Sequence, residues 1–268
     1  MDQLLNIMIE TARDAGKIIL EAGKEQIGIK TKSSFRDVVT KYDVQIQAFA
    51  EERLKSSFPD AGFVAEEDEE EKKSQKSEKA DAAPSGQMVF VIDPIDGTAN
   101  FSHHYQHSCI SIGCVQGQEP VAGVVYDPFL DEMFTAEKGN GAFLNGQPLT
   151  IPPHSLEEVI VLFGSAPYNM ELAEETFGNV RKVFGKCQDI RRSGSAALDL
   201  CYVAAGRAGM FFESILSVWD YAAGALMVQE AGGVCMSMKG EPLVFDRPVK
   251  SSVIAGRAEL LNESGLLL

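Results

Sequence analysis

Two aspartates three positions apart follow an apolar, β-branched run, and they are the strongest chemical signal in this sequence. The run Val89–Ile92 predicts a buried strand, and it leads into the string Asp93-Pro94-Ile95-Asp96-Gly97-Thr98-Ala99-Asn100-Phe101. Because moving a carboxylate out of water is costly unless it is paired, we expect a cation at this strand end. The structural alternative is a simple Asp-Pro turn with an Asx cap.

The residues around the two aspartates indicate which cation it would be. Pro94 fixes the backbone after Asp93, and Gly97 permits a tight turn after Asp96, so both carboxylates and a freed carbonyl can face one point. All these donors are hard oxygens, which favours Mg²⁺, with Mn²⁺ as a possible substitute, over zinc. The N–H groups of Gly97 and Thr98 could each bind a phosphate oxygen.

Two further acidic segments could complete such a site. Glu66 and Glu67 follow the short apolar run 63–65, where a strand could emerge beside the Asp93 strand. The alternative is a solvated acidic run, which is our interpretation of residues 68–71. Asp220 stands at the start of a predicted helix in the string Val218-Trp219-Asp220-Tyr221-Ala222-Ala223-Gly224, where a helix cap would need no metal.

The composition sets the class of protein. The 268 residues are 45% hydrophobic and carry a net charge of −15, as in a soluble globular protein that does not bind nucleic acid through charge. We find no apolar run of the roughly 18 residues needed to cross a membrane and no signal peptide. Five scattered cysteines favour free thiols, and hence a cytoplasmic location.

Hydrophobic periodicity and turn signals predict an α+β fold in which helices and sheets form separate layers. The predicted helices are 3–22, 43–57, 170–183, 196–205 and 220–230. The predicted strands are 63–65, 89–92, 109–115, 121–126, 132–137, 142–144 and 234–238. The stretch 72–86 is rich in Lys, Ser, Glu and Ala and predicts a mobile surface loop.

In this order and spacing, the motifs resemble the D-P-I-D-G-T-x-N-F and W-D-x-A-A-G signatures of the inositol monophosphatase family of lithium-sensitive, magnesium-dependent phosphatases. The resemblance extends to Lys32, Asp37 and 40–43, to Ala65-Glu66-Glu67 (with Ala65 in place of the usual Gly), and to 194–197. It implies a layered αβαβα sandwich of the inositol monophosphatase and fructose-1,6-bisphosphatase type, and a homodimer. We expect a single domain over 1–268, with closely packed lobes of roughly 1–150 and 151–268.

The same resemblance implies roles for individual residues. One Mg²⁺ would be held by Glu66, Asp93 and the carbonyl of Ile95, and a second by Asp93, Asp96 and Asp220. A third, weaker ion would lie at Glu66, with Glu67 supporting the ligands. Asp43 and Thr98 would orient and deprotonate the attacking water. The expected substrate contacts are Gly97, Thr98, Gly194, Ser195, Ala196 and Glu213.

We therefore predict a magnesium-dependent phosphomonoesterase that acts on a small-molecule sugar or polyol phosphate, with myo-inositol 1-phosphate as the preferred substrate. The alternatives are fructose 1,6-bisphosphate, NADP or 3′-phosphoadenosine 5′-phosphate as substrate, or a non-catalytic regulatory or scaffold protein. Ser217 stands where inositol-hydrolysing members often have His, which weakens the assignment to inositol. The loop 163–170 is expected to face substrate.

Weaker signals are three histidines and one aspartate. His103, His104 and His107 could form a zinc site, although an exposed loop is the favoured interpretation. Asp199 lies in a predicted helix and is interpreted as structural.

Overall fold

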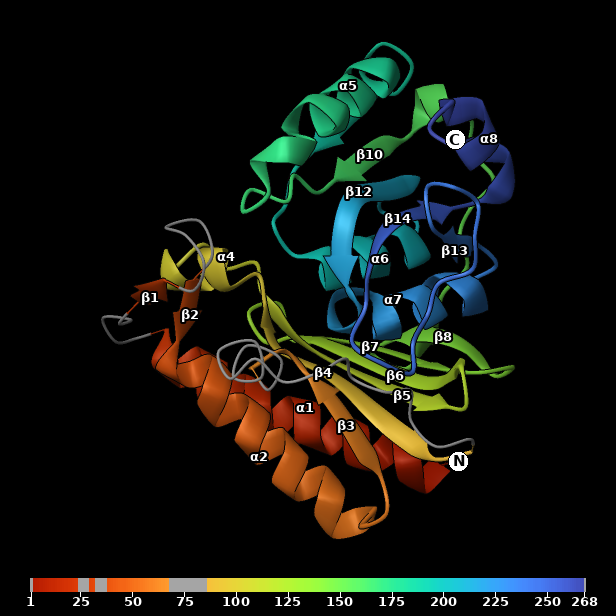
Figure 1. Ribbon diagram of the computed structural model, residues 1–268. Helices are drawn as coiled ribbons and strands as arrows, with labels where there is room; N and C mark the ends of the chain where they lie inside the picture. Colours follow the sequence, from red (N-terminus) through yellow and green to blue (C-terminus); the bar gives the residue numbers. More distant parts are fainter. Residues whose placement is uncertain (1, 24–28, 32–37, 68–85, 268) are drawn as a thin grey trace.

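Five layers of helices and sheets make up the computed structural model, which describes residues 2–23, 29–31, 38–67 and 86–267. From the bottom of Figure 1 upward, they are a helix pair, a large sheet, a second helix pair, a smaller sheet and an outer helical layer. This arrangement confirms the predicted α+β sandwich. The predicted loop 72–86, apart from Gly86, and the motif residues Lys32 and Asp37 lie outside the described residues.

The large sheet has seven strands in sequence order. Only its first two strands are parallel to each other, and every other neighbouring pair is antiparallel. The strands are β3 (Gly62–Ala65), β4 (Met88–Asp96), β5 (Cys109–Gln116), β6 (Glu119–Asp127), β7 (Glu132–Glu137), β8 (Gly141–Leu144) and β9 (Gln147–Pro148). β4 contains both aspartates, with Asp96 as its last residue.

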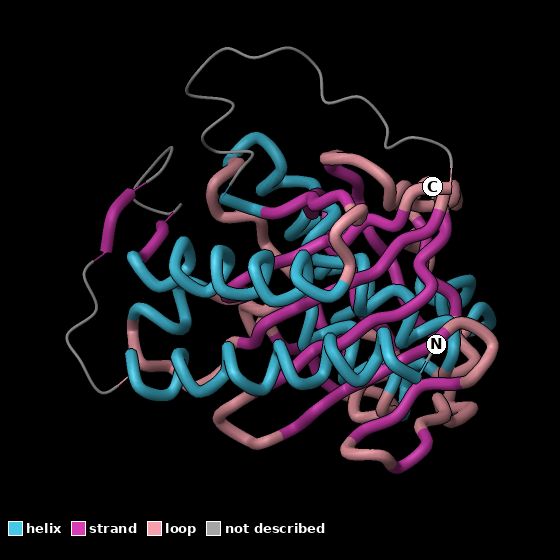
Figure 2. Tube along the Cα trace, turned by 90° about the horizontal axis from the view of Figure 1, so that it is seen from below, coloured by secondary structure: helices cyan, strands magenta, loops and turns pink. Residues whose placement is uncertain are grey.

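Two helices, α1 (Asp2–Ala22) and α2 (Lys41–Ser57), cover the outer face of this sheet, and Figure 2 shows them side by side across the strands. Their buried side chains, such as Met8 and Ile46, form one core with Phe90 and Ile92 of β4. Burial of such side chains contributes roughly 1.5–3 kcal/mol each, so this core fixes β4 against the helices.

The smaller sheet has the strand order β11-β10-β12-β14-β13. Its strands are β10 (Ile160–Phe163), β11 (Asp189–Arg191), β12 (Met210–Ser217), β13 (Val234–Met236) and β14 (Lys250–Gly256). Its outer face is covered by α5 (Ala173–Phe184) and α8 (Ala258–Ser264), with the short 3-10 helices η1 (Leu156–Glu158) and η2 (Met170–Leu172) beside them. All its strands come from the second half of the chain, but the two-lobe division stays a prediction.

The central layer consists of α6 (Ala196–Ala204) and α7 (Val218–Glu230), which lie between the two sheets (Figure 1). α7 packs closely against the large sheet. A Cβ added at Gly113 of β5 would lie 3.0 Å from the Cβ of Ala222, and one at Gly123 of β6 would lie 3.1 Å from the Cα of Ala223. Because small residues face each other, α7 sits directly on the sheet and its first turn reaches the end of β4.

Several predicted element boundaries shift in the structure. β4 continues to Asp96 instead of ending at residue 92, and α7 begins at Val218, so Asp220 is its third residue. The predicted helix 170–183 divides into η2 and α5. A short hairpin of β1 (Ile29–Thr31) and β2 (Val38–Thr40), which we did not predict, precedes α2, and α4 (Thr98–Ser102) follows β4.

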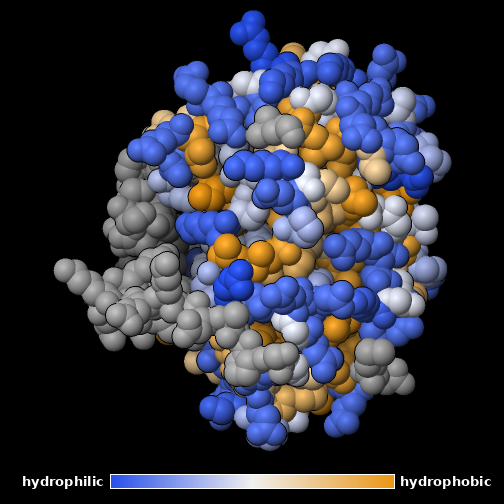
Figure 3. All heavy atoms as spheres, turned by 45° about the vertical axis from the view of Figure 1, so that its right-hand side comes forward, coloured by the Kyte–Doolittle hydropathy of each residue, from blue (hydrophilic) through white to orange (hydrophobic). Residues whose placement is uncertain are grey.

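The surface agrees with the composition. On the face shown in Figure 3, hydrophilic side chains predominate and apolar ones show between them. No helix among the described residues is long and apolar enough to cross a membrane. All five cysteines are free thiols, and only Cys187 is not fully buried.

Candidate active site

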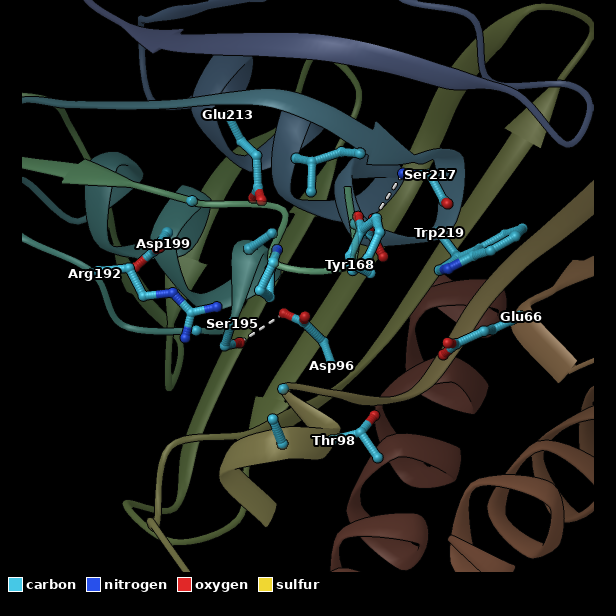
Figure 4. Close-up of a pocket in the computed structure, with 18 of the residues that line it drawn as sticks. Glu66, Asp96, Thr98, Tyr168, Arg192, Ser195, Asp199, Glu213, Ser217 and Trp219 are labelled. Carbon is cyan, nitrogen blue, oxygen red and sulfur yellow. Dashed lines mark hydrogen bonds between the residues drawn. The ribbon is translucent and has the colours of Figure 1, made fainter. Parts of the chain in front are cut away.

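A cavity of about 200 Å³ lies where the end of β4 meets the first turns of α6 and α7 (Figure 4). One side of it is acidic, with Glu66, Asp96 and Asp220 in its lining. The Gly97-Thr98 turn, Gly194, Ser195, Ala196 and Glu213 also line it. The fold thus brings residues from distant parts of the chain to one place.

Parallel pairing of β3 with β4 places the first carboxylates together. The register aligns Ala65 with Ile92, so Glu66 leaves β3 beside Asp93. This is the arrangement predicted for Glu66, which follows the apolar run 63–65.

A bulge in β4 places Asp93 and Asp96 on the same face of the sheet. Asp93 pairs with Ser111 and Asp96 with Cys109, so three steps along β4 match two along β5. In a regular strand, residues three apart would point to opposite faces, and one extra residue corrects this. Pro94 is tolerated here because a bulge does not require its missing N–H.

Asp96 is held by the start of α6. Its Oδ2 accepts hydrogen bonds from the Ser195 hydroxyl at 2.6 Å and from the Ala197 backbone N–H at 2.7 Å. Burial raises the pKa of Asp96 to about 6, although these donors favour its charged form.

Asp93 and Asp220 lack comparable compensation. Asp93 is 3% exposed, and its Oδ1 has no hydrogen-bond partner among the described residues. Burial, followed by the charge of Glu66, holds the pKa of Asp93 well above its usual range. Asp220 forms a capping box with Ser217, whose N–H donates to Asp220 Oδ2 at 2.7 Å, but burial and Asp96 still raise the pKa of Asp220 well above its usual range.

These groups fit divalent cations in their chemistry. Every donor is an oxygen, and the buried, mutually repelling carboxylates would be stabilised by positive charge. Within the described part of the chain, no three His, Cys, Asp or Glu side chains converge closely enough to hold one ion in this arrangement. Since Asp96 Oδ2 is engaged by Ser195 and Ala197, metal binding would use its other oxygen or a rotation of the side chain.

Asp43 and Thr98 meet at the edge of the acidic cluster. Asp43 Oδ2 accepts from the Thr40 backbone N–H at 2.8 Å and the Thr40 hydroxyl at 2.6 Å, as part of the capping box of α2. The Thr98 hydroxyl lies 3.3 Å from Asp43 Oδ1 and 3.0 Å from the carbonyl oxygen of Ile95. The cap therefore fixes Asp43 with its second oxygen toward Thr98.

The turn beside Thr98 depends on glycine. Gly97 has φ +89°, and an added Cβ would lie 3.1 Å from the His107 carbonyl oxygen and 3.2 Å from that of Gly194. The Asn100 amide donates to the carbonyls of His107 at 2.8 Å and Ser193 at 3.0 Å. These bonds hold the turn against the 193–195 segment.

Glu213 on β12 forms the opposite wall. It is 8% exposed, and its Oε1 accepts from the Ala166 backbone N–H at 3.0 Å. Burial raises the pKa of Glu213 to about 7, while Ala166 and the more distant Arg192 charge favour ionisation. This end of the cavity therefore offers a buried acceptor away from the acidic cluster.

Comparison with known proteins agrees with this geometry. The model of the inositol monophosphatase family matches residues 1–265. The chain belongs to the inositol monophosphatase family. Inositol monophosphatase 2 of Solanum lycopersicum is 35% identical over 249 residues, covering 90% of this chain and 89% of the relative. Nus factor SuhB of Xylella fastidiosa is 35% identical over 263 residues, covering 96% of this chain and 91% of the relative.

A solved structure extends the comparison to the fold. The extragenic suppressor protein SuhB from Bartonella henselae matches with a TM-score of 0.87 and 33% identity, covering 99% of this chain and 98% of that one. The family and its inositol monophosphatase members support a phosphatase, and such phosphatases are generally metal-dependent.

Within this inositol monophosphatase fold, two predicted residues have neighbours that the sequence did not suggest. The Glu67 backbone N–H donates to Gln47 Oε1 of α2 at 2.9 Å, which ties the acidic segment to that helix. Ser195, predicted as a substrate contact, both binds Asp96 and caps α6 by accepting from the Leu198 N–H.

Other cavity residues were missed. Arg192 and Lys250 line the cavity, but nothing in the sequence placed them there. Trp219 also lines it, although the sequence indicated no role for it beyond the motif around Asp220. Asp199 also lines it and is 2% exposed, with no partner for Oδ1 among the described residues and a pKa raised well above its usual range by burial. Its purely structural interpretation is therefore incomplete. In the loop 163–170, which is expected to face substrate, Gly164, Pro167 and Tyr168 line the cavity.

The histidines divide into two groups. His103 and His104 are exposed, as predicted. The exposed-loop prediction is wrong for His107, which is half-buried with its ring edge on Tyr202 at 5.8 Å between centroids, and whose pKa is lowered by burial. An aromatic partner distant in the sequence explains the difference.

Proposed function

We propose that this protein is a magnesium-dependent phosphomonoesterase that hydrolyses a sugar or polyol phosphate, with myo-inositol 1-phosphate as the preferred substrate. The observation that carries the proposal is the placement of buried Asp93 and Asp96 with the partly buried Asp220 and Glu66 beside the Gly97-Thr98 turn. Such a concentration of buried carboxylates is costly for a protein that binds no cation. Relatives named inositol monophosphatases support the substrate.

The ligands would divide as the motifs imply. Glu66, Asp93 and the Ile95 carbonyl would hold one ion, and Asp93, Asp96 and Asp220 another, with a third and weaker ion at Glu66. When bound, magnesium lowers the pKa of water and neutralises charge on the phosphate. Glu67 would support the ligands from its attachment to Gln47.

The chain's own groups would then move the proton and orient the ester. Thr98 is a poor base, so Asp43, fixed by Thr40, would accept the proton that a water molecule passes to Thr98. The Gly97 and Thr98 N–H groups would hold phosphate oxygens. At the other end, Glu213 would accept a hydrogen bond from a substrate hydroxyl, with Gly194, Ser195 and Ala196 forming the wall between.

A substrate panel tests the proposal. The purified protein should release phosphate from inositol 1-phosphate only with Mg²⁺, and faster than from fructose 1,6-bisphosphate, NADP or 3′-phosphoadenosine 5′-phosphate. Asp93→Asn should reduce kcat by about 100-fold or more, since it removes charge that stabilises the transition state. Asp60→Asn, an exposed change of the same kind, should have no effect. Absence of magnesium-dependent release from all four compounds would refute the proposal.

A second candidate is a regulatory role, which the Nus factor name of one relative suggests. The complete set of candidate ligands favours catalysis, and Asp93→Asn separates the two roles because a scaffold would tolerate it. We also propose that the protein is a homodimer, which sedimentation of the purified protein tests, and that it is cytoplasmic, which fractionation of the cells tests.

A further inference from the structure

The cavity has an apolar side that binding of the phosphate does not explain. Pro167, Tyr168, Leu216 and Trp219 line it, and Leu216 and Trp219 are almost fully buried. In Figure 4, the Tyr168 ring projects between Arg192 and Trp219. A phosphate group gains nothing from contact with apolar side chains. We therefore expect these side chains to contact the part of the substrate that leaves as an alcohol.

Tyr168 is held in this position by the loop that contains it. Ala166 has φ +38°, a conformation that non-glycine residues rarely adopt, and it is 1% exposed. Its N–H donates to Glu213 Oε1 at 3.0 Å. A Cβ at Gly164 would collide with the Glu213 carboxyl group, so glycine is required for this close contact. The contacts with Glu213 therefore hold the loop on β12 in spite of the strained backbone at Ala166.

The Tyr168 side chain is partly exposed where it lines the cavity. Tyr168 is 39% exposed, and Lys250 Nζ lies 5.4 Å from its ring centroid. The flat face of an aromatic ring complements the C–H face of a cyclic alcohol, and it gives much less to a short acyclic one.

We propose that Tyr168 is a specificity-determining residue that selects phosphate esters of ring alcohols by packing on the ring of the leaving group. This inference rests on the proposed function and names the feature by which the same site would choose its substrate. Glu213 would accept a hydrogen bond from a hydroxyl of the substrate ring, while Tyr168 would contact the apolar face of that ring. The bond between Ala166 and Glu213 links the positions of these two side chains.

The test compares a ring substrate, inositol 1-phosphate, with an acyclic one, glycerol 2-phosphate, in the full-length protein with Mg²⁺. Tyr168→Ala should lower kcat/KM for inositol 1-phosphate about tenfold and leave that for glycerol 2-phosphate within about twofold. Tyr168→Phe keeps the ring and should leave both within about twofold. Tyr105→Ala, an exposed tyrosine outside this cavity, is the matched control.

Retained turnover of glycerol 2-phosphate also shows that Tyr168→Ala is folded. An equal fall for both substrates, or no change for inositol 1-phosphate, would overturn the inference. A wild-type protein inactive on both substrates would instead contradict the proposed function, so the two failures are distinguishable.

Discussion

Glu213→Gln should stabilise the folded protein at alkaline pH. The folded protein raises the pKa of Glu213 from 4.5 to about 7, chiefly through burial. The folded state therefore binds this proton more tightly than the unfolded state does. Stability is then highest below pH 4.5 and falls as the pH rises through 7, because the buried group must lose its proton.

The size of the effect follows from the shift. Each pKa unit corresponds to about 1.4 kcal/mol, so a change from 4.5 to about 7 costs the folded state about 3 kcal/mol above pH 7. Glutamine is neutral at every pH and keeps an oxygen that can accept the Ala166 N–H. The variant should therefore gain up to about 3 kcal/mol over the wild type at pH 8.5 and nearly nothing at pH 4.

The assay is urea unfolding of both proteins with chelator present, at pH 4 and pH 8.5. Titration of the acidic cluster is common to both proteins and largely cancels in their difference. The repulsion between ionised Glu213 and Asp96, Asp199 and Asp220 is lost in the variant, which favours the variant in the same direction. Glu241→Gln, at an exposed position, should leave the free energy of unfolding unchanged at either pH. If Glu213→Gln is equally or less stable than the wild type at pH 8.5, the reasoning about this buried carboxyl is wrong.

Two further predictions concern the same walls of the cavity. Gly164→Ala should destabilise the protein by about 1–3 kcal/mol in urea unfolding, because the new Cβ collides with the Glu213 carboxyl group. An unchanged midpoint would show that the contact is not close. Thr98→Val removes the hydroxyl that faces Asp43 and should lower kcat by about 100-fold with little change in melting temperature. Activity near the wild-type level would rule out the proton path proposed for this pair.

The acidic side of the site could be predicted from the sequence because its signals are local. Asp93 and Asp96 stand in one string with Pro94 and Gly97, and Glu66 follows a strand that pairs with theirs. The sequence could not reveal that Ser195 holds Asp96, since that bond joins residues 99 positions apart.

The opposite wall was harder to predict for a physical reason. Tyr168, Arg192 and Asp199 have no spacing that links them, and they meet only because the smaller sheet and α6 pack together. Strands β10, β12 and β14 of that sheet were also missed, because short apolar runs do not distinguish a buried strand from a helix.

The position of α7 between the two sheets has a consequence for biosynthesis. The large sheet is complete at Pro148, but the helix that covers its inner face ends at Glu230. At typical ribosome speeds, synthesis of the intervening segment takes roughly 4 to 16 seconds. During that interval the face around Gly113 and Gly123 remains open to the crowded surroundings of the nascent chain. The incomplete chain must therefore be kept from aggregating during this interval. At that stage Asp93 and Asp96 are already made, but Asp220 is not.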